Sequence, residues 1–142
     1  MPITLAQASI VVDATLGKAR ELECAPLAVA VTDAGGHLMA FKREDRAGIL
    51  RFDIAYGKAW GALGMGFGTR ELASRAVSNP AFLTALAAVS GGRIVPSPGG
   101  VLVLDGEEVI GAVGVSGDTG DRDEECALAG IIAAGLAGQT GA

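Results

Sequence analysis

Cysteine is scarce in this sequence of 142 residues. The two cysteines, Cys24 and Cys126, have no CxxC spacing, and apolar residues flank each of them. A buried free thiol is the ordinary explanation for such a cysteine, so neither a disulfide nor a cysteine metal motif is predicted.

The sequence also lacks an excess of basic residues and any long apolar run. Eleven basic residues are scattered along a chain of net charge −5, which argues against nucleic acid and anionic membranes as partners. No uncharged stretch approaches the roughly 18 residues of a membrane helix, and no basic segment precedes an apolar one at the N-terminus. We therefore predict a cytoplasmic protein with no membrane partner.

Familiar catalytic motifs are missing as well. The sequence contains no HExxH, GxSxG or GxxxxGK[ST] pattern, and no GxGxxG that follows a strand and opens a helix. The glycine-rich stretch 64–68 follows a predicted helix, which is typical of a helix end and loop. The sequence motifs alone therefore do not decide whether the protein is an enzyme.

The composition indicates one compact domain over residues 1–142. Half of the residues are apolar and 19% are charged, which is enough apolar material for a hydrophobic core that needs no stabilising disulfide or metal ion. Glycine and alanine are abundant but dispersed, and small residues on helices let elements or subunits approach closely. A homo-oligomer is expected.

Local patterns predict an α+β protein. Thr4 and Gln7 form a capping box before a helix that runs to about Glu23. Strands are expected at 26–33 and 37–42, and helices at about 52–63, 69–77 and 80–89. A hairpin over 101–116 with an Asp105-Gly106 turn, a last helix with acidic residues in its first turn, and a frayed tail at 138–142 complete the chain. Helices and antiparallel hairpins in this order belong to the α+β class.

The second strand of the later hairpin has one face of very small residues. Alternation assigns Val109, Gly111, Val113 and Val115 to one face, and Ile110, Ala112, Gly114 and Ser116 to the other. Glycine in a strand interior is usually kept where another backbone, a helix or a ligand comes close. The end of this strand at Ser116 is therefore a candidate wall of a binding site.

Four segments in order resemble the GlcG/HbpS-like family, and the similarity runs nearly end to end. The segments are Val31-Thr-Asp-Ala-Gly-Gly-His-Leu-Met-Ala-Phe41, Ile54-Ala-Tyr-Gly-Lys-Ala59, Gly91-Gly-Arg-Ile-Val-Pro96 and Val109-Ile-Gly-Ala-Val-Gly-Val-Ser-Gly117. Members include haem-binding proteins and the C-terminal domain of some corrinoid adenosyltransferases. The resemblance implies a profilin-like, five-stranded antiparallel sheet flanked by helices, often in dimers or higher oligomers, and haem or another tetrapyrrole as the ligand.

A haem site needs an axial donor beside an apolar slot. His37 is the only histidine, and alternation assigns it to one strand face with Met39 and Phe41, which could form a donor and aromatic row. Tyr56 is a further candidate donor, as is Met65. The alternative is that His37 is a solvated residue at the end of a turn while Met39 and Phe41 belong to the core.

Three more residues are candidates for binding a ligand. Lys58 lies at the edge of an apolar helix stripe, where it could reach an anion or cover apolar surface with its stem. Arg93 follows two glycines and could bind a carboxylate or pair with an acidic side chain. Ser116 and the start of the last helix could hold an anion, but the four acids there, Asp121, Asp123, Glu124 and Glu125, are better explained as helix stabilisers. A divalent cation held by Asp118, Asp123 and Glu124 is a minor alternative.

Three functions remain open at this stage. The first is binding of a small molecule, with haem or another tetrapyrrole implied by the resemblance and the site between the first two helices and the Ser116 strand end. The second is an enzyme for a small organic acid or carbonyl metabolite, in which Lys58 and Arg93 anchor the substrate and a carboxylate or Tyr56 transfers a proton. The third is a structural, oligomerising domain.

Overall fold

A five-stranded antiparallel sheet forms the centre of the computed structural model, which describes residues 1–142. The strand order is β2-β1-β4-β3-β5. Its strands are β1 (Ala28–Asp33), β2 (Leu38–Arg43), β3 (Gly100–Asp105), β4 (Glu108–Ser116) and β5 (Ala137–Gln139). The predicted α+β class and the five-stranded antiparallel sheet flanked by helices are confirmed.

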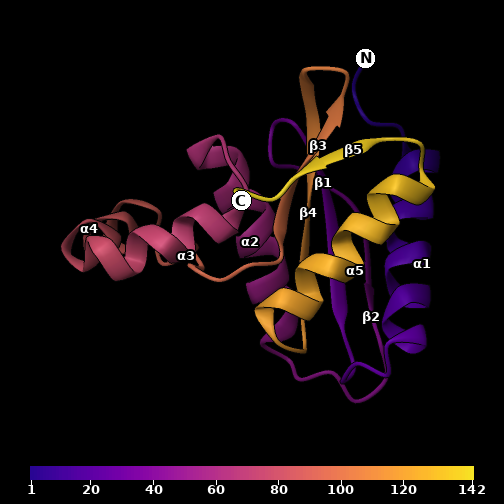
Figure 1. The fold of residues 1–142 in the computed structure, drawn as a ribbon, viewed down its shortest axis with the longest axis horizontal. Helices are drawn as coiled ribbons and strands as arrows, with labels where there is room; N and C mark the ends of the chain where they lie inside the picture. The colour runs from indigo at the N-terminus through magenta and orange to yellow at the C-terminus, as the bar shows by residue number, and fades with distance from the viewer.

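Helices cover both faces of this sheet. On one face, α1 (Leu5–Glu21) and α5 (Gly120–Ala133) pack against each other, and on the other face α2 (Arg51–Met65) packs across β1, β3 and β4 (Figure 1). Two shorter helices, α3 (Thr69–Ser78) and α4 (Pro80–Val89), form an arm that projects from the body (Figure 1). None of these helices is long and apolar enough to cross a membrane.

The two faces of the sheet carry side chains of different size. Valines point toward α1 and α5 and form the main core with residues such as Val29, Val113 and Ile131. Ala28, Ala30, Ala112 and Gly114 lie on the face toward α2. Because these residues are small, the backbone of α2 lies directly on β4, and a Cβ atom at Gly114 would overlap the carbonyl oxygen of Ala55.

The predicted alternation in β4 holds for its second half and fails at its start. The register shifts where Leu104 pairs with Val109 and Val103 pairs with Gly111, so that Ile110 is an extra residue on β4. Such a bulge turns the strand by one residue. As a result Ile110 is buried in the main core, while Val109, predicted to share a face with Val113, is partly exposed.

The C-terminal tail forms the edge strand and does not fray, so that prediction is wrong. Residues 137–139 pair with β3, and the Gln139 side chain accepts a hydrogen bond of 2.7 Å from the backbone of Gly68. The Thr140 carbonyl oxygen accepts another from the backbone of Arg70. These long-range bonds have no local sequence signal.

The helices follow the predicted caps and buried faces with two corrections. The Thr4–Gln7 capping box and the Asn79 cap before Pro80 are both present. Thr69 does not cap α3, because Gly68 takes that position and the Thr69 hydroxyl accepts a hydrogen bond from the backbone of Gly100. Ile132, predicted on the buried stripe of the last helix, is 67% exposed, whereas Ile131 is buried.

One buried ion pair links α2, β4 and α5. The ammonium group of Lys58 lies 3.1 Å from a carboxylate oxygen of Asp123 and donates a hydrogen bond of 2.8 Å to the carbonyl oxygen of Val115. The other Asp123 oxygen accepts from the backbone of Asp118, and both side chains are at most 3% exposed. Burial lowers the pKa of Lys58 and raises the pKa of Asp123, so desolvation outweighs the attraction between them.

Substitution of Gly114 by alanine tests the contact between α2 and β4. The added methyl group would collide with helix backbone, so we expect the free energy of unfolding to fall by about 3 kcal/mol or more. Gly17→Ala is the matched control, because nothing lies near a Cβ atom on that face of α1 and alanine should stabilise the helix by about 0.5–1 kcal/mol. Urea denaturation measures both, and equal stability of the two variants would refute the close packing.

Removal of the Lys58 charge tests the buried pair. Lys58→Met leaves the Asp123 carboxylate buried without its partner, so we expect a loss of about 3–5 kcal/mol near neutral pH. The carboxyl pKa is already raised by burial and rises further without Lys58. A group with a raised pKa stabilises the folded state as the pH falls, so the loss should be smaller at about pH 5 than at about pH 7.

The exposed pair between Lys42 and Asp13 provides the control for this substitution. Both side chains are about 60% exposed, so Lys42→Met should change stability by less than about 1 kcal/mol at either pH. Denaturation curves of both variants at the two pH values give the comparison. A Lys58→Met protein as stable as the Lys42→Met protein would show that the pair is not buried.

Candidate functional site

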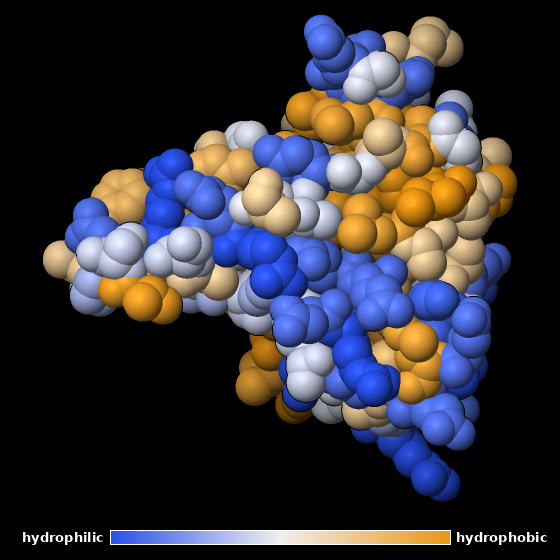
Figure 2. Space-filling model, in the orientation of Figure 1, coloured by the Kyte–Doolittle hydropathy of each residue, from blue (hydrophilic) through white to orange (hydrophobic).

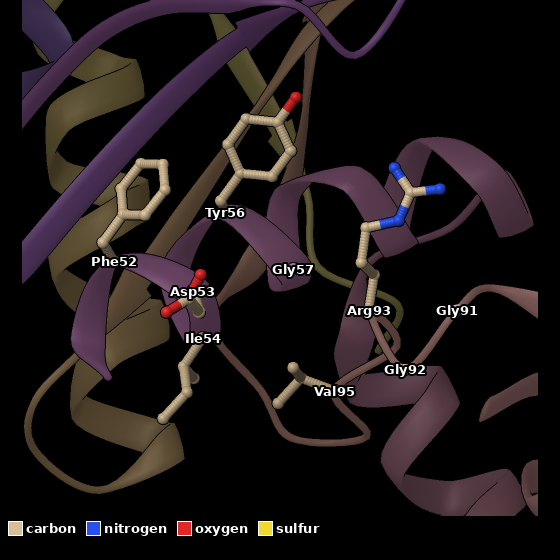
Figure 3. Close-up of a pocket in the computed structure, with 9 residues that line it drawn as sticks. All are labelled: Phe52, Asp53, Ile54, Tyr56, Gly57, Gly91, Gly92, Arg93 and Val95. Atoms are coloured by element: carbon tan, nitrogen blue, oxygen red, sulfur yellow. The ribbon is translucent and has the colours of Figure 1, made fainter. Parts of the chain in front are cut away.

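A cavity of about 440 Å³ lies between α2 and the segment that returns from α4 to the sheet. Its lining residues, drawn in Figure 3, are Phe52, Asp53, Ile54, Tyr56 and Gly57 from α2, and Gly91, Gly92, Arg93 and Val95 from the returning segment. The cavity is open to solvent on one side, and its walls combine apolar side chains, backbone and two charged groups.

Glycines determine how the returning segment meets α2. Gly91 and Gly92 both have positive φ values, 67° and 82°, and reverse the chain after α4. On α2, a side chain at Gly57 would collide with the carbonyl oxygen of Arg93. The segment can therefore lie against the helix, and the cavity forms beside this contact.

Three aromatic side chains follow one another along α2 at intervals of four residues. Phe52, Tyr56 and Trp60 are each half-buried, and Phe52 also contacts Phe41 on β2 with ring centroids 4.9 Å apart and nearly perpendicular planes. The centroids of Phe52 and Tyr56 are 5.7 Å apart. Two of these rings line the cavity. The spacing i, i+4, i+8 is a sequence signal from which this aromatic row could have been predicted.

Tyr56 is held in place by a hydrogen bond from α2 to the β1–β2 turn. Its hydroxyl donates to the carbonyl oxygen of Gly36 in the β1–β2 turn at 2.5 Å. Tyr56 is the one predicted donor residue that lines the cavity, since His37, Met39 and Met65 do not.

Arg93 provides the positive charge of the site. Its guanidinium carbon lies 3.7 Å from the centroid of the Trp60 ring, and its Nε donates to the carbonyl oxygen of Ser90 at 3.1 Å. The two terminal nitrogens have no partner within the chain. Figure 3 shows Arg93 across the cavity from Phe52 and Tyr56, so a ligand bound between these walls would meet two donor groups of a cation.

His37 and Met39 lie away from the cavity and on different surfaces. The His37 side chain is 80% exposed, and its Nδ1 lies 3.1 Å from an oxygen of Asp33. Met39 packs against the main core while Phe41 packs on the α2 side, because the β1–β2 register shifts between Val31 and Thr32. The predicted row of His37, Met39 and Phe41 on one face is therefore wrong.

Lys58 and Ser116 lie on the sheet side of α2 and do not line the cavity. Lys58 donates hydrogen bonds to Val115 and Asp123, so the alternative in which its stem covers apolar surface below a solvated ammonium group is wrong. The Ser116 hydroxyl is buried and accepts a hydrogen bond of 3.0 Å from Arg51. Packing of α2 on β4 fills the space at the strand end, which was the predicted position of a site wall.

The acidic residues near the start of α5 do not form a metal site. Asp118 accepts from the backbone of Ala25 and Thr119, Asp123 pairs with Lys58, and Glu124 binds Arg70 in a bidentate manner. No group of three or more potential ligands occurs in the structure.

Comparison with known proteins identifies the family. The family described as "Haem degrading protein HbpS-like" matches residues 3–132. A 15.0 kDa protein of Citrobacter freundii, encoded in its dhaT-dhaS intergenic region, is 39% identical over 121 residues, with 85% of this chain and 84% of that protein covered.

Two further relatives are a longer enzyme that contains a similar sequence and a solved structure of the same fold. The corrinoid adenosyltransferase PduO of Citrobacter freundii is 31% identical over 120 residues, and the match covers 84% of this chain but only 35% of that enzyme. A crystal structure of a PduOC–haem complex superposes with a TM-score of 0.86 at 26% identity, covering 96% of this chain and 97% of the other. With the match of the family over residues 3–132, these similarities show that the chain belongs to the HbpS-like family.

Proposed function

We propose that the protein binds haem or another tetrapyrrole in the cavity between α2 and the Gly91–Val95 segment. The observation that carries the proposal is the pairing of an aromatic wall, formed by Phe52 and Tyr56, with the unpaired guanidinium nitrogens of Arg93. A flat apolar molecule with carboxylates matches both parts.

The residues of the cavity fit this class of ligand. Phe52, Ile54 and Val95 offer apolar contact to a ring system, and Arg93 offers two N–H groups to a carboxylate. Bound haem would supply an iron that takes an oxygen, nitrogen or sulfur donor from the protein. The Tyr56 phenol is the donor that this cavity provides, and it would exchange its hydrogen bond to Gly36 for that role.

The relatives support the same ligand class. The family description refers to haem degradation, and PduOC, which has the same fold at 26% identity, is described as a complex with haem. Neither relationship identifies the residues that would contact a ligand in this chain, so the assignment of Tyr56 and Arg93 comes from the cavity itself.

The alternative of an enzyme is weakened, because one residue predicted to anchor its substrate lies away from the cavity. Lys58, expected to anchor a small acid beside Arg93, is buried in its pair with Asp123 on the sheet side of α2. Asp53 and Tyr56 remain in the cavity, but no contact links either of them to a further acid or base. We therefore favour binding over acid–base catalysis.

A second proposal concerns assembly, and it rests on α4. Thr84 is the only polar residue of this helix, none of its ten residues is buried, and α3 is the only helix or strand that it contacts. Apolar side chains are visible on the surface of the arm in Figure 2. An apolar helix left in water is costly, so we propose that a second copy of the chain covers α4 in a homo-oligomer.

Haemin titration tests the ligand proposal. We expect a saturable Soret change near one haem per chain for the unmodified protein, and roughly tenfold weaker binding for Arg93→Ala because a charge-assisted hydrogen bond is lost. Arg75→Ala is the matched control, since Arg75 also stacks on an aromatic ring, Phe67, but lies outside the cavity. Equal affinities of the two variants would refute the role of Arg93.

Two more variants in the same titration separate the axial donor from the rest of the site. Tyr56→Phe keeps the aromatic wall and should shift the Soret maximum with little change in stoichiometry, whereas His37→Ala should leave the spectrum unchanged. A non-saturating titration of the unmodified protein would exclude haem from the cavity. Loss of the spectrum in His37→Ala would move the ligand to the β1–β2 turn.

Sedimentation velocity tests the role of α4. Glutamate at both Phe82 and Val89 places charges on exposed apolar positions of the helix, so we expect the oligomer to dissociate into monomers. Val109→Glu, at a partly exposed valine near the hairpin turn, is the control and should leave the oligomer intact. A monomeric unmodified protein at micromolar concentration would refute self-association.

A further inference from the structure

The two cysteines meet in the core although 102 residues separate them. Their sulfur atoms lie 4.0 Å apart, and both side chains are buried. A disulfide bond has a sulfur–sulfur distance of about 2.05 Å, so closure requires the two atoms to approach by about 2 Å. No other residue intervenes between them, since the sulfurs are already within hydrogen-bonding range of each other.

The two sides of this pair differ in their freedom to move. Cys126 lies on α5, whose backbone is fixed by helical hydrogen bonds and by packing against α1. Cys24 lies in the connection between α1 and β1, directly after Glu23, which has a positive φ of 57°. The Cys24 backbone is itself held to α1, because its N–H donates to the carbonyl oxygen of Ala19 and its carbonyl oxygen accepts from Arg20. The approach of the Cys24 sulfur to Cys126 therefore needs rotation of the cysteine side chains and a small shift of this connection.

We propose that Cys24 and Cys126 are a modification site at which a peroxide forms an intramolecular disulfide. The Cys24 sulfur attacks one oxygen of hydrogen peroxide and becomes a sulfenic acid as the first water leaves. The Cys126 sulfur then bonds to the sulfenic sulfur while the S–O bond breaks, and the Cys126 thiol proton joins the departing hydroxyl group as the second water. Two thiols lose two electrons and two protons in total, and one peroxide is reduced to two waters.

The order of the two steps follows from burial and charge. Cys24 is 4% exposed and lies at the edge of the core, whereas Cys126 is completely buried. Burial raises the pKa of the Cys126 thiol to about 12, with the nearby Cys24 and the acidic side chains of Asp123 and Glu125 adding to the effect. Cys126 therefore stays protonated at neutral pH, and Cys24 is the sulfur that meets the peroxide.

Closure of this bond would tie α1 to α5. The bridge joins distant parts of the chain, so it restricts the unfolded state strongly and should raise the melting temperature by about 10 °C. The site lies in the layer formed by α1 and α5, on the opposite face of the sheet from α2 and the cavity. This inference is independent of the ligand proposal.

The experiment compares the reduced chain of 142 residues with Cys24→Ser and Cys126→Ser after brief exposure to hydrogen peroxide. For the unmodified protein we expect an intact mass lower by two hydrogen atoms, no thiol left to alkylate after denaturation, and a peptide that joins the two cysteine segments. The higher melting temperature should return to the reduced value after treatment with a phosphine. Both serine variants should lack the mass loss and the thermal shift.

Three results would overturn the proposal. The first is an unmodified protein that gains oxygen atoms on Cys24 while Cys126 remains available for alkylation after denaturation. The second is a disulfide that joins two chains, visible as a dimer on a non-reducing gel. The third is recovery of both free thiols after an exposure that fully oxidises the same thiols in urea.

Discussion

The close contact between α2 and the small face of the sheet is the constraint on which the rest of the structure depends. Ala28, Ala30, Ala112 and Gly114 are so small that the backbone of α2 at Ala55 meets the backbone of β4 at Gly114. The opposite face carries valines and therefore needs two helices, α1 and α5, to bury it. A difference in side-chain size between two strand faces thus sets which helix lies where.

The same contact determines which residues occupy each side of α2. The side toward the sheet carries Ala55, Ala59 and Ala62, with Lys58 as its one charged residue, and that lysine donates to a strand carbonyl and to Asp123. The ion pair carries a net cost in desolvation, yet it joins α2, β4 and α5 at one point and specifies their relative positions. Aromatic residues occupy the flank of α2 because the sheet side has no room for them.

The cavity is a consequence of the same arrangement. Because one side of α2 packs closely on the sheet, its flank is covered only by the segment that follows the arm of α3 and α4. The return runs through Gly91 and Gly92 and lies on Gly57, and it brings Arg93 over Trp60 beside the aromatic wall. The cavity on one side of α2 and the buried ion pair on another therefore both result from the close contact between α2 and the sheet. The exposed apolar helix α4 belongs to the same segment that leads to the cavity.

The sequence by itself determined the local structure. Capping at Thr4 and Asn79, the Asp105-Gly106 turn and the apolar periodicity predict the helices and four of the strands, because these signals act over a few residues. It also pointed to Tyr56 and Arg93, two of the residues that line the cavity.

Only the tertiary structure decided the rest. The bulges at Met39 and Ile110 place side chains of β2 and β4 on other faces of the sheet than strict alternation predicts. Residues 137–139 form a strand because they pair with β3. Lys58 became a buried partner of Asp123 because a contact across 65 residues depends on how α2 and α5 dock, which no local pattern records.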